Sequence, residues 1–206
     1  MEQKSGGRTL LASVILSSPG PIVVGIGLLL GRSSTQLADF IRRTAELAAI
    51  IVSWAVYTVT HKESSMDEQK KAHLARIANL SVGAAMCLGG AAMLAVALLS
   101  DSGEKGNVIP GLVIAILGVA TNTWFWFRYR ALNKKDPDAI LAVQAKLYRA
   151  KSLVDACVTA ALATVAIAPA SAAARYMDLA GSIIVAIYLA FSGAATLWGK
   201  KEFAKA

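Results

Sequence analysis

The sequence predicts an all-α membrane protein built from six transmembrane helices. Of its 206 residues, 56% are hydrophobic and 17% are charged, and the mean hydropathy is +0.55. Six apolar runs each approach or exceed the roughly 20 residues that a helix needs to cross the hydrocarbon of a bilayer. Because the bilayer core offers backbone groups no partners, such runs are expected to be helical. The runs cover residues 9–31, 35–59, 75–99, 108–131, 139–167 and 177–199.

The first run follows Lys4 and Arg8 and resembles the start of a signal peptide. Its apolar stretch continues to Leu30 without a small-x-small cleavage pattern, so we expect an uncleaved first span. The prolines at 19 and 21 should kink this helix near its middle, since proline removes a backbone donor.

Polar and turn-forming segments separate the later runs. They lie at 31–34, 61–73, 101–107 and 133–138, and the last of them ends in Asp138 after a proline. Aspartate is a preferred N-cap, so Asp138 is expected to begin the fifth helix.

Positive charge predicts the orientation of the bundle. One set of loops and helix ends carries 13 basic residues, whereas the opposite set carries Arg32, Lys105 and Arg175. Basic residues concentrate on the cytoplasmic side of membrane proteins, so both termini are expected in the cytoplasm. The 13 residues are Lys4, Arg8, Lys62, Lys70, Lys71, Arg76, Arg128, Arg130, Lys134, Lys135, Lys200, Lys201 and Lys205.

We interpret residues 1–206 as a single transmembrane domain without a soluble C-terminal domain, because only residues 199–206 follow the last run. The net charge of +8 is explained by topology, so no nucleic acid is expected as a partner. No Ser/His/Asp, phosphate-loop or zinc-hydrolase pattern occurs, which argues against an enzyme. Cys87 and Cys157 lie in apolar runs and are expected to be small buried hydrophobic residues.

Two of the predicted spans repeat one charge pattern, a basic residue followed four positions later by an acid. Arg42 and Glu46 form it in the second span, and Lys151 and Asp155 form it in the fifth. Residues four apart share a face of a helix. Charges at bilayer depth are costly and mark functional sites by default. The pattern therefore predicts a polar transport site, or a salt-bridge quartet, between the second and fifth helices.

Both site helices are the middle members of three-helix halves, as in transporters built from an inverted repeat. If the two helices pack antiparallel, the order of charge reverses between them. Arg42 is then expected opposite Asp155, and Lys151 opposite Glu46. Four further polar residues are expected to support the site, namely Asp39, Arg43, Asn122 and Asp178.

Two short segments carry a family resemblance. Residues 31–39 read GRSSTQLAD and residues 176–186 read YMDLAGSIIVA. With Asn122 in the fourth span and the order and length of the spans, they resemble the membrane domain of the cation diffusion facilitators. The resemblance implies a six-helix metal transporter, usually a homodimer, with a metal site shared by the second and fifth helices.

The chain departs from that family at the site itself. The family places His or Asp, three residues, then Asp on both helices, whereas the first positions here are Arg42 and Lys151. Glu46 and Asp155 keep the acids and are the expected metal ligands. Arginine stays protonated and only donates hydrogen bonds, so Arg42 should oppose a bare metal ion. The family's cytoplasmic metal-binding tail domain is also absent from the sequence.

The leading hypothesis is a secondary transporter that moves a cation of the divalent metal class, in exchange for protons, between the second and fifth helices. A divalent metal ion is then a substrate, and no resident cofactor is expected. Two alternatives stay open: the same fold with an anionic or zwitterionic substrate, or a non-transporting scaffold whose quartet is a structural lock. The expected setting is the bilayer of a bacterial inner membrane, as a multi-pass homodimer.

Overall fold

The structure is a computed structural model that describes residues 3–30, 34–62, 66–99, 109–168 and 172–198. Within these residues every regular element is an α-helix, which confirms the all-α fold class. The helices occupy the predicted spans, and most of them extend a few residues beyond the apolar runs. They are α1 (Gln3–Ser17), α2 (Pro19–Leu30), α3 (Ser34–Lys62), α4 (Glu68–Leu99), α5 (Ile109–Lys135), α6 (Ala139–Ile167) and α7 (Ala172–Leu197).

The first predicted span is broken into α1 and α2 at Ser18, where a kink was expected. Pro19 begins α2 directly after the break. Proline fits the first turn of a helix but cannot continue one, because it has no N–H. The Ser18 hydroxyl donates to the carbonyl of Val14 at 2.6 Å, so a side chain caps the end of α1.

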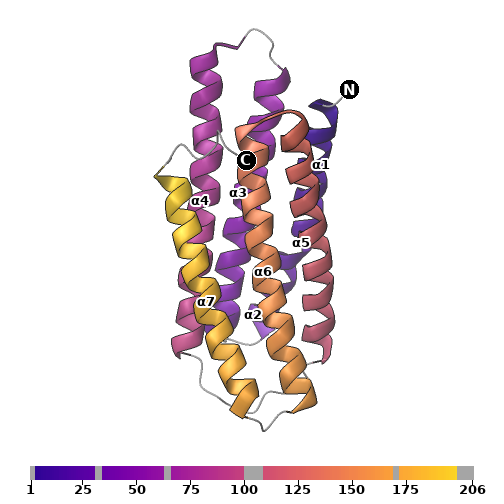
Figure 1. Cartoon of the computed structure of the whole chain (residues 1–206), viewed down its shortest axis with the longest axis vertical. Coiled ribbons are helices and arrows are strands. Elements are labelled where there is room, and N and C mark those ends of the chain that lie inside the picture. Colours follow the sequence, from indigo (N-terminus) through magenta and orange to yellow (C-terminus); the bar gives the residue numbers. More distant parts are fainter. Residues whose placement is uncertain (1–2, 31–33, 63–65, 100–108, 169–171, 199–206) are drawn as a thin grey trace.

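The helices run along one long axis, and the start of α1 and the end of α7 lie toward the same end of the bundle (Figure 1). We call this the terminal end; the end of α3, the start of α4 and the α5–α6 connection also lie there. Packing partners are α5 with α6, α4 with α7, and α3 with α4, and α6 also contacts α7 and α4. Helices α3 and α6 approach each other over a short stretch.

One helix of the described part of the chain is long and apolar enough to cross a membrane by composition alone, namely Glu68–Ala95 within α4. A shorter apolar stretch, Ile183–Leu197, lies in α7. Helices α3 and α6 have 29 residues each, against 32 for α4, and carry the ionisable residues that form the candidate site.

Glycine allows α4 and α7 to pack backbone against backbone. A Cβ added at Gly90 would lie 2.9 Å from the carbonyl oxygen of Ala186, and one at Gly193 would lie 2.8 Å from that of Gly83. Both carbonyls belong to the backbone of a helix, so they cannot move aside without distorting that helix. Close helix contact through small residues is a general means of association inside membranes.

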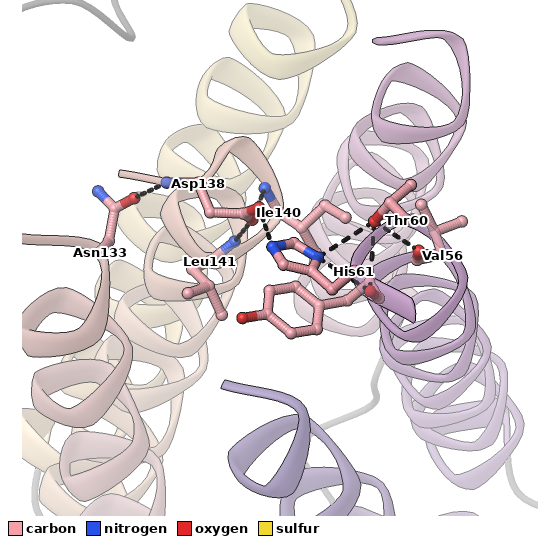
Figure 2. Close-up of polar contacts among 8 residues, drawn as sticks. Val56, Thr60, His61, Asn133, Asp138, Ile140 and Leu141 are labelled. Atoms are coloured by element: carbon pink, nitrogen blue, oxygen red, sulfur yellow. Dashed lines mark hydrogen bonds and ion pairs between the residues drawn. The ribbon is translucent and has the colours of Figure 1, made fainter. Parts of the chain in front are cut away.

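At the terminal end, Asp138 joins α3 to α6 (Figure 2). Its Oδ1 accepts hydrogen bonds from the backbone N–H groups of Ile140 and Leu141, which confirms the predicted N-cap. Its Oδ2 lies 3.6 Å from Nε2 of His61, the next-to-last residue of α3. The ring of His61 stacks on that of Tyr57 with centroids 4.0 Å apart, which holds the imidazole toward Asp138.

We expect Gly90→Ala to destabilise the protein by about 1–3 kcal/mol, because the new methyl group overlaps the α7 backbone. Gly7→Ala is the matched control, since its Cβ would meet Tyr57 at an ordinary 3.8 Å. The control should be neutral or gain up to about 1 kcal/mol of helix propensity. Thermal unfolding in detergent measures both, and equal melting temperatures would contradict close α4–α7 packing.

Replacing Asp138 separates its two contacts. Asp138→Ala loses the cap and the ion pair, and we expect a loss of about 1 kcal/mol or more. Asp138→Asn keeps an N-cap of similar quality and loses only the charge facing His61 at 3.6 Å, so its loss should be smaller, about a few tenths of a kcal/mol. Denaturant unfolding of both variants against the parent is the measurement, and a larger loss for Asn than for Ala contradicts the capping role.

Candidate transport site between α3 and α6

The repeated charge pattern lies where two antiparallel helices meet. Helix α3 supplies Arg42 and Glu46, and α6 supplies Lys151 and Asp155. Both pairs are spaced four residues apart, so each pair projects from one helical face. The structure therefore brings together all four residues that the sequence pattern singled out.

Glu46 lies between two cations. Its Oε1 is 3.4 Å from Nη1 of Arg42 on the same helix, and its Oε2 is 3.5 Å from Nζ of Lys151 on α6. The side chains of Arg42, Glu46 and Lys151 are 10%, 8% and 13% exposed. This burial removes most of their water, so the three groups depend on one another for charge compensation. The Lys151–Glu46 contact is the cross-helix pairing expected from the reversed order of charge.

Asp155 is held differently. Its Oδ2 accepts a hydrogen bond of 2.6 Å from the side-chain amide of Asn122 on α5. A Cβ added at Gly118, one turn before Asn122, would lie 2.5 Å from the same oxygen. Arg42, Lys151 and Glu46 are all close enough to act on Asp155 electrostatically, but no ion pair joins Arg42 to Asp155 among the described side chains. Asn122 is thereby a supporting residue with a direct contact to the quartet.

Lys151 has a second neighbour that the sequence pattern did not reveal. Its Nζ lies 5.0 Å from the ring centroid of Tyr148, which is fully buried one turn earlier on α6. A cation over an aromatic face is attracted by the ring quadrupole. The Tyr148 hydroxyl is 3.2 Å from that of Ser17 at the end of α1. The contact could have been expected from the sequence, because Tyr148 lies three residues before Lys151 and so shares its helical face.

The two adjacent arginines of α3 reach different neighbours. The aliphatic part of Arg42 lies against Gly89 of α4, where an added Cβ would come within 3.3 Å of its Cγ. Arg43 lies against Gly20 of α2, where an added Cβ would come within 3.4 Å of its Nη1. The other two supporting residues, Asp39 on α3 and Asp178 on α7, have side chains outside the described part of the structure.

Few of the described side chains at this site could bind a metal ion. No group of three or more His, Cys, Asp or Glu side chains comes together among the residues that the structure describes. Glu46 and Asp155 are the carboxylates of the site, and each already has hydrogen-bond or charge partners. His61 lies at the terminal end beside Asp138, away from this pair.

We expect Glu46→Gln to destabilise the protein more than Lys151→Gln. The first change leaves two buried cations without their shared anion, whereas the second leaves Glu46 paired with Arg42. Breaking a buried pair in this way typically costs about 3–5 kcal/mol. The double variant should lose less than the sum of the single losses, because it removes both members of one pair. Unfolding of the four proteins in detergent is the measurement, and additive losses would contradict a direct Lys151–Glu46 interaction.

Comparison with known proteins supplies the family. The model of the cation efflux transmembrane domain matches residues 10–200, which is nearly the whole chain. No curated protein and no solved structure matches. The match covers the seven helices that the structure describes, apart from the first residues of α1. The chain therefore belongs to the cation efflux family, whose members are multi-pass membrane proteins that transport cations.

Proposed function

We propose that this protein exchanges a cation of the divalent metal class for protons, and that the cation passes between α3 and α6. The observation that carries the proposal is that the two carboxylates of the site have different partners. Glu46 is paired with Arg42 and Lys151, whereas Asp155 is held by the neutral amide of Asn122. Asp155 is thus the carboxylate that is more readily available to an entering cation.

Charge balance links the cation to protons. With all four groups ionised, Arg42 and Lys151 compensate Glu46 and Asp155, and the site is neutral. A cation arriving at Asp155 adds charge in a region of low dielectric, where uncompensated charge is costly. Arginine keeps its proton in proteins, whereas the amine of a lysine is a group that can exchange one. Release of that proton offsets part of the incoming charge and frees the amine nitrogen as a ligand.

The ligand chemistry supports brief occupancy rather than a resident metal. Two carboxylates and one amine offer a mixed oxygen and nitrogen set, and Arg42 repels a cation at the same place. A transporter needs a site that is strong enough to admit its cargo and weak enough to release it. The permanent charge of Arg42 supplies the second requirement.

The proposal includes the orientation of the chain in the membrane. The 13 basic residues of the predicted cytoplasmic side support placing both termini in the cytoplasm. The beginning of α1 and the end of α7 lie at one end of the bundle, which is compatible with that placement.

A second candidate function follows from the chain of contacts Arg42–Glu46–Lys151. These ion pairs satisfy one another and would also suit a structural lock that fixes the register of α3 against α6. Under that reading, Asp155→Asn leaves all three members of the lock in place and keeps both assembly and function. Under the transport proposal it assembles but does not transport.

We expect Asp155→Asn to abolish cation flux into proteoliposomes loaded with a divalent-metal dye, and to abolish the accompanying proton movement reported by a pH dye. The change keeps the shape and the hydrogen bond to Asn122 while removing the charge. The matched control is Asp67→Asn, which neutralises an exposed acid just before α4. The control should transport like the parent.

Two results would contradict the proposal. Flux that is equal in parent and Asp155→Asn removes Asp155 from the pathway. Cation flux without any proton movement, at every pH gradient tried, removes the exchange while leaving a cation transporter of the family. Uptake of anions that is lost in Arg42→Gln and indifferent to divalent metals would support the anionic alternative instead.

A further inference from the structure

Gln144 is a fully buried amide without a partner. Its side chain on α6 is 0% exposed, and both Oε1 and Nε2 lack a hydrogen-bond partner in the described part of the chain. Buried polar groups in proteins are nearly always paired with protein or with ordered water. The proposed function does not use this residue, so its polarity needs another explanation.

Gln144 shares a helical face with the transport site. It lies seven residues before Lys151 and four before Tyr148, and these spacings bring side chains onto one face of a helix. At 1.5 Å per residue, Gln144 is about 10 Å from Lys151 along α6, toward the terminal end. The same face thus carries a buried amide, a buried phenol and the two charges in sequence.

Two neighbouring helices have polar residues at the same level. Because α3 runs antiparallel to α6, seven steps on from the Glu46–Lys151 contact bring Ser53 level with Gln144. The contact of Gly89 with Arg42 likewise brings Asn79 of α4 to about this level. The Oδ1 atom of Asn79 is also buried without a partner, whereas the Ser53 hydroxyl donates to the carbonyl of Ala49.

A small pocket lies beyond the level of Ser53 and Gln144, toward the terminal end. Its lining includes Tyr57 of α3 and Leu141 of α6, together with Gly6, Leu132, Lys135 and Asp136. Tyr57 lies one turn beyond Ser53, and Leu141 lies one turn before Gln144. The His61–Asp138 contact borders the same region and keeps the ends of α3 and α6 together (Figure 2).

The chemistry of an amide identifies the ligand. Oε1 accepts hydrogen bonds and Nε2 donates them, so one ligand class must do both. Water satisfies both atoms, whereas a metal cation would satisfy Oε1 alone and leave Nε2 facing a positive charge. Internal water commonly bridges buried polar groups that the protein leaves unpaired.

We propose that Gln144 binds internal water, and that this water connects the terminal-end pocket to the Lys151–Glu46 pair as its proton route. Hydration of Gln144 stands on the unpaired amide by itself, while its use as a proton route rests on the proton exchange proposed above. Asn79 Oδ1 accepts from the same water.

X-ray hydroxyl-radical footprinting of the full-length protein in detergent tests the water directly. Radicals formed from bound water oxidise nearby side chains that bulk solvent does not reach. Tyr148 is the reporter, since it is 0% exposed and lies one turn from Gln144. We expect clear labelling of Tyr148 in the parent, and labelling several-fold slower in Gln144→Leu. Ser53→Ala is the matched control, because its buried hydroxyl already has a partner, and it should label like the parent.

Proton movement in proteoliposomes tests the route. Gln144→Leu should slow the proton movement driven by the cation several-fold, while the shift in melting temperature on adding the cation stays that of the parent. Unchanged proton movement in this variant overturns the route.

If Gln144→Leu does not fold, the labelling of Tyr148 in the parent still tests whether Gln144 is hydrated. An unlabelled Tyr148 in the parent shows a dry amide and overturns the inference. If the parent moves no protons at all but Tyr148 is labelled, the exchange is wrong and the water site stands. The two proposals therefore fail in different measurements.

Discussion

Glu46 lies between Arg42 of its own helix and Lys151 of α6, and this short chain of charges constrains the middle of the bundle. Three ionisable side chains are removed from water there, and each is tolerable only while the others stay in place. The constraint ties α3 to α6 at one level, although these helices contact each other over a short stretch. Asp155 completes the balance of charge from the same face of α6.

The neighbouring helices are shaped to accommodate that cluster. Gly89 of α4 leaves room for the aliphatic part of Arg42, and Gly118 of α5 leaves room for the carboxylate of Asp155. Asn122 then holds Asp155 through a neutral amide. At the other side of the bundle, glycines let α4 and α7 approach backbone to backbone, so that α4 is fixed against α7 while it faces α3. Space at glycine is therefore as much a part of the site as the charges.

Much of the fold was predictable because the bilayer imposes simple rules. A run of about 20 apolar residues in a bilayer is expected to be helical, and prolines near the middle of such a run are expected to kink it. The break at Ser18 and the cap at Asp138 followed from local chemistry in the same way. The pairing of Lys151 with Glu46 was also accessible, since antiparallel packing reverses the order of charge. The partner of Asp155 was not predictable, because the sequence is compatible with either Arg42 or Asn122 beside it. Only the positions of α4 and α5 in the folded bundle decide that Asn122 makes the contact.

The sequence by itself determined the place of the helical spans, their apolar surfaces, and the face on which each charge lies. These properties depend on residues that are close along the chain, so periodicity and turn chemistry are sufficient. The tertiary structure alone decided that Glu46 is shared by two cations, that Asp155 is held by a neutral amide, and that Gln144 is buried without a partner. Those facts depend on how helices that are distant in sequence are rotated and how closely they approach. Small residues on several of these helices determine both the rotation and the distance.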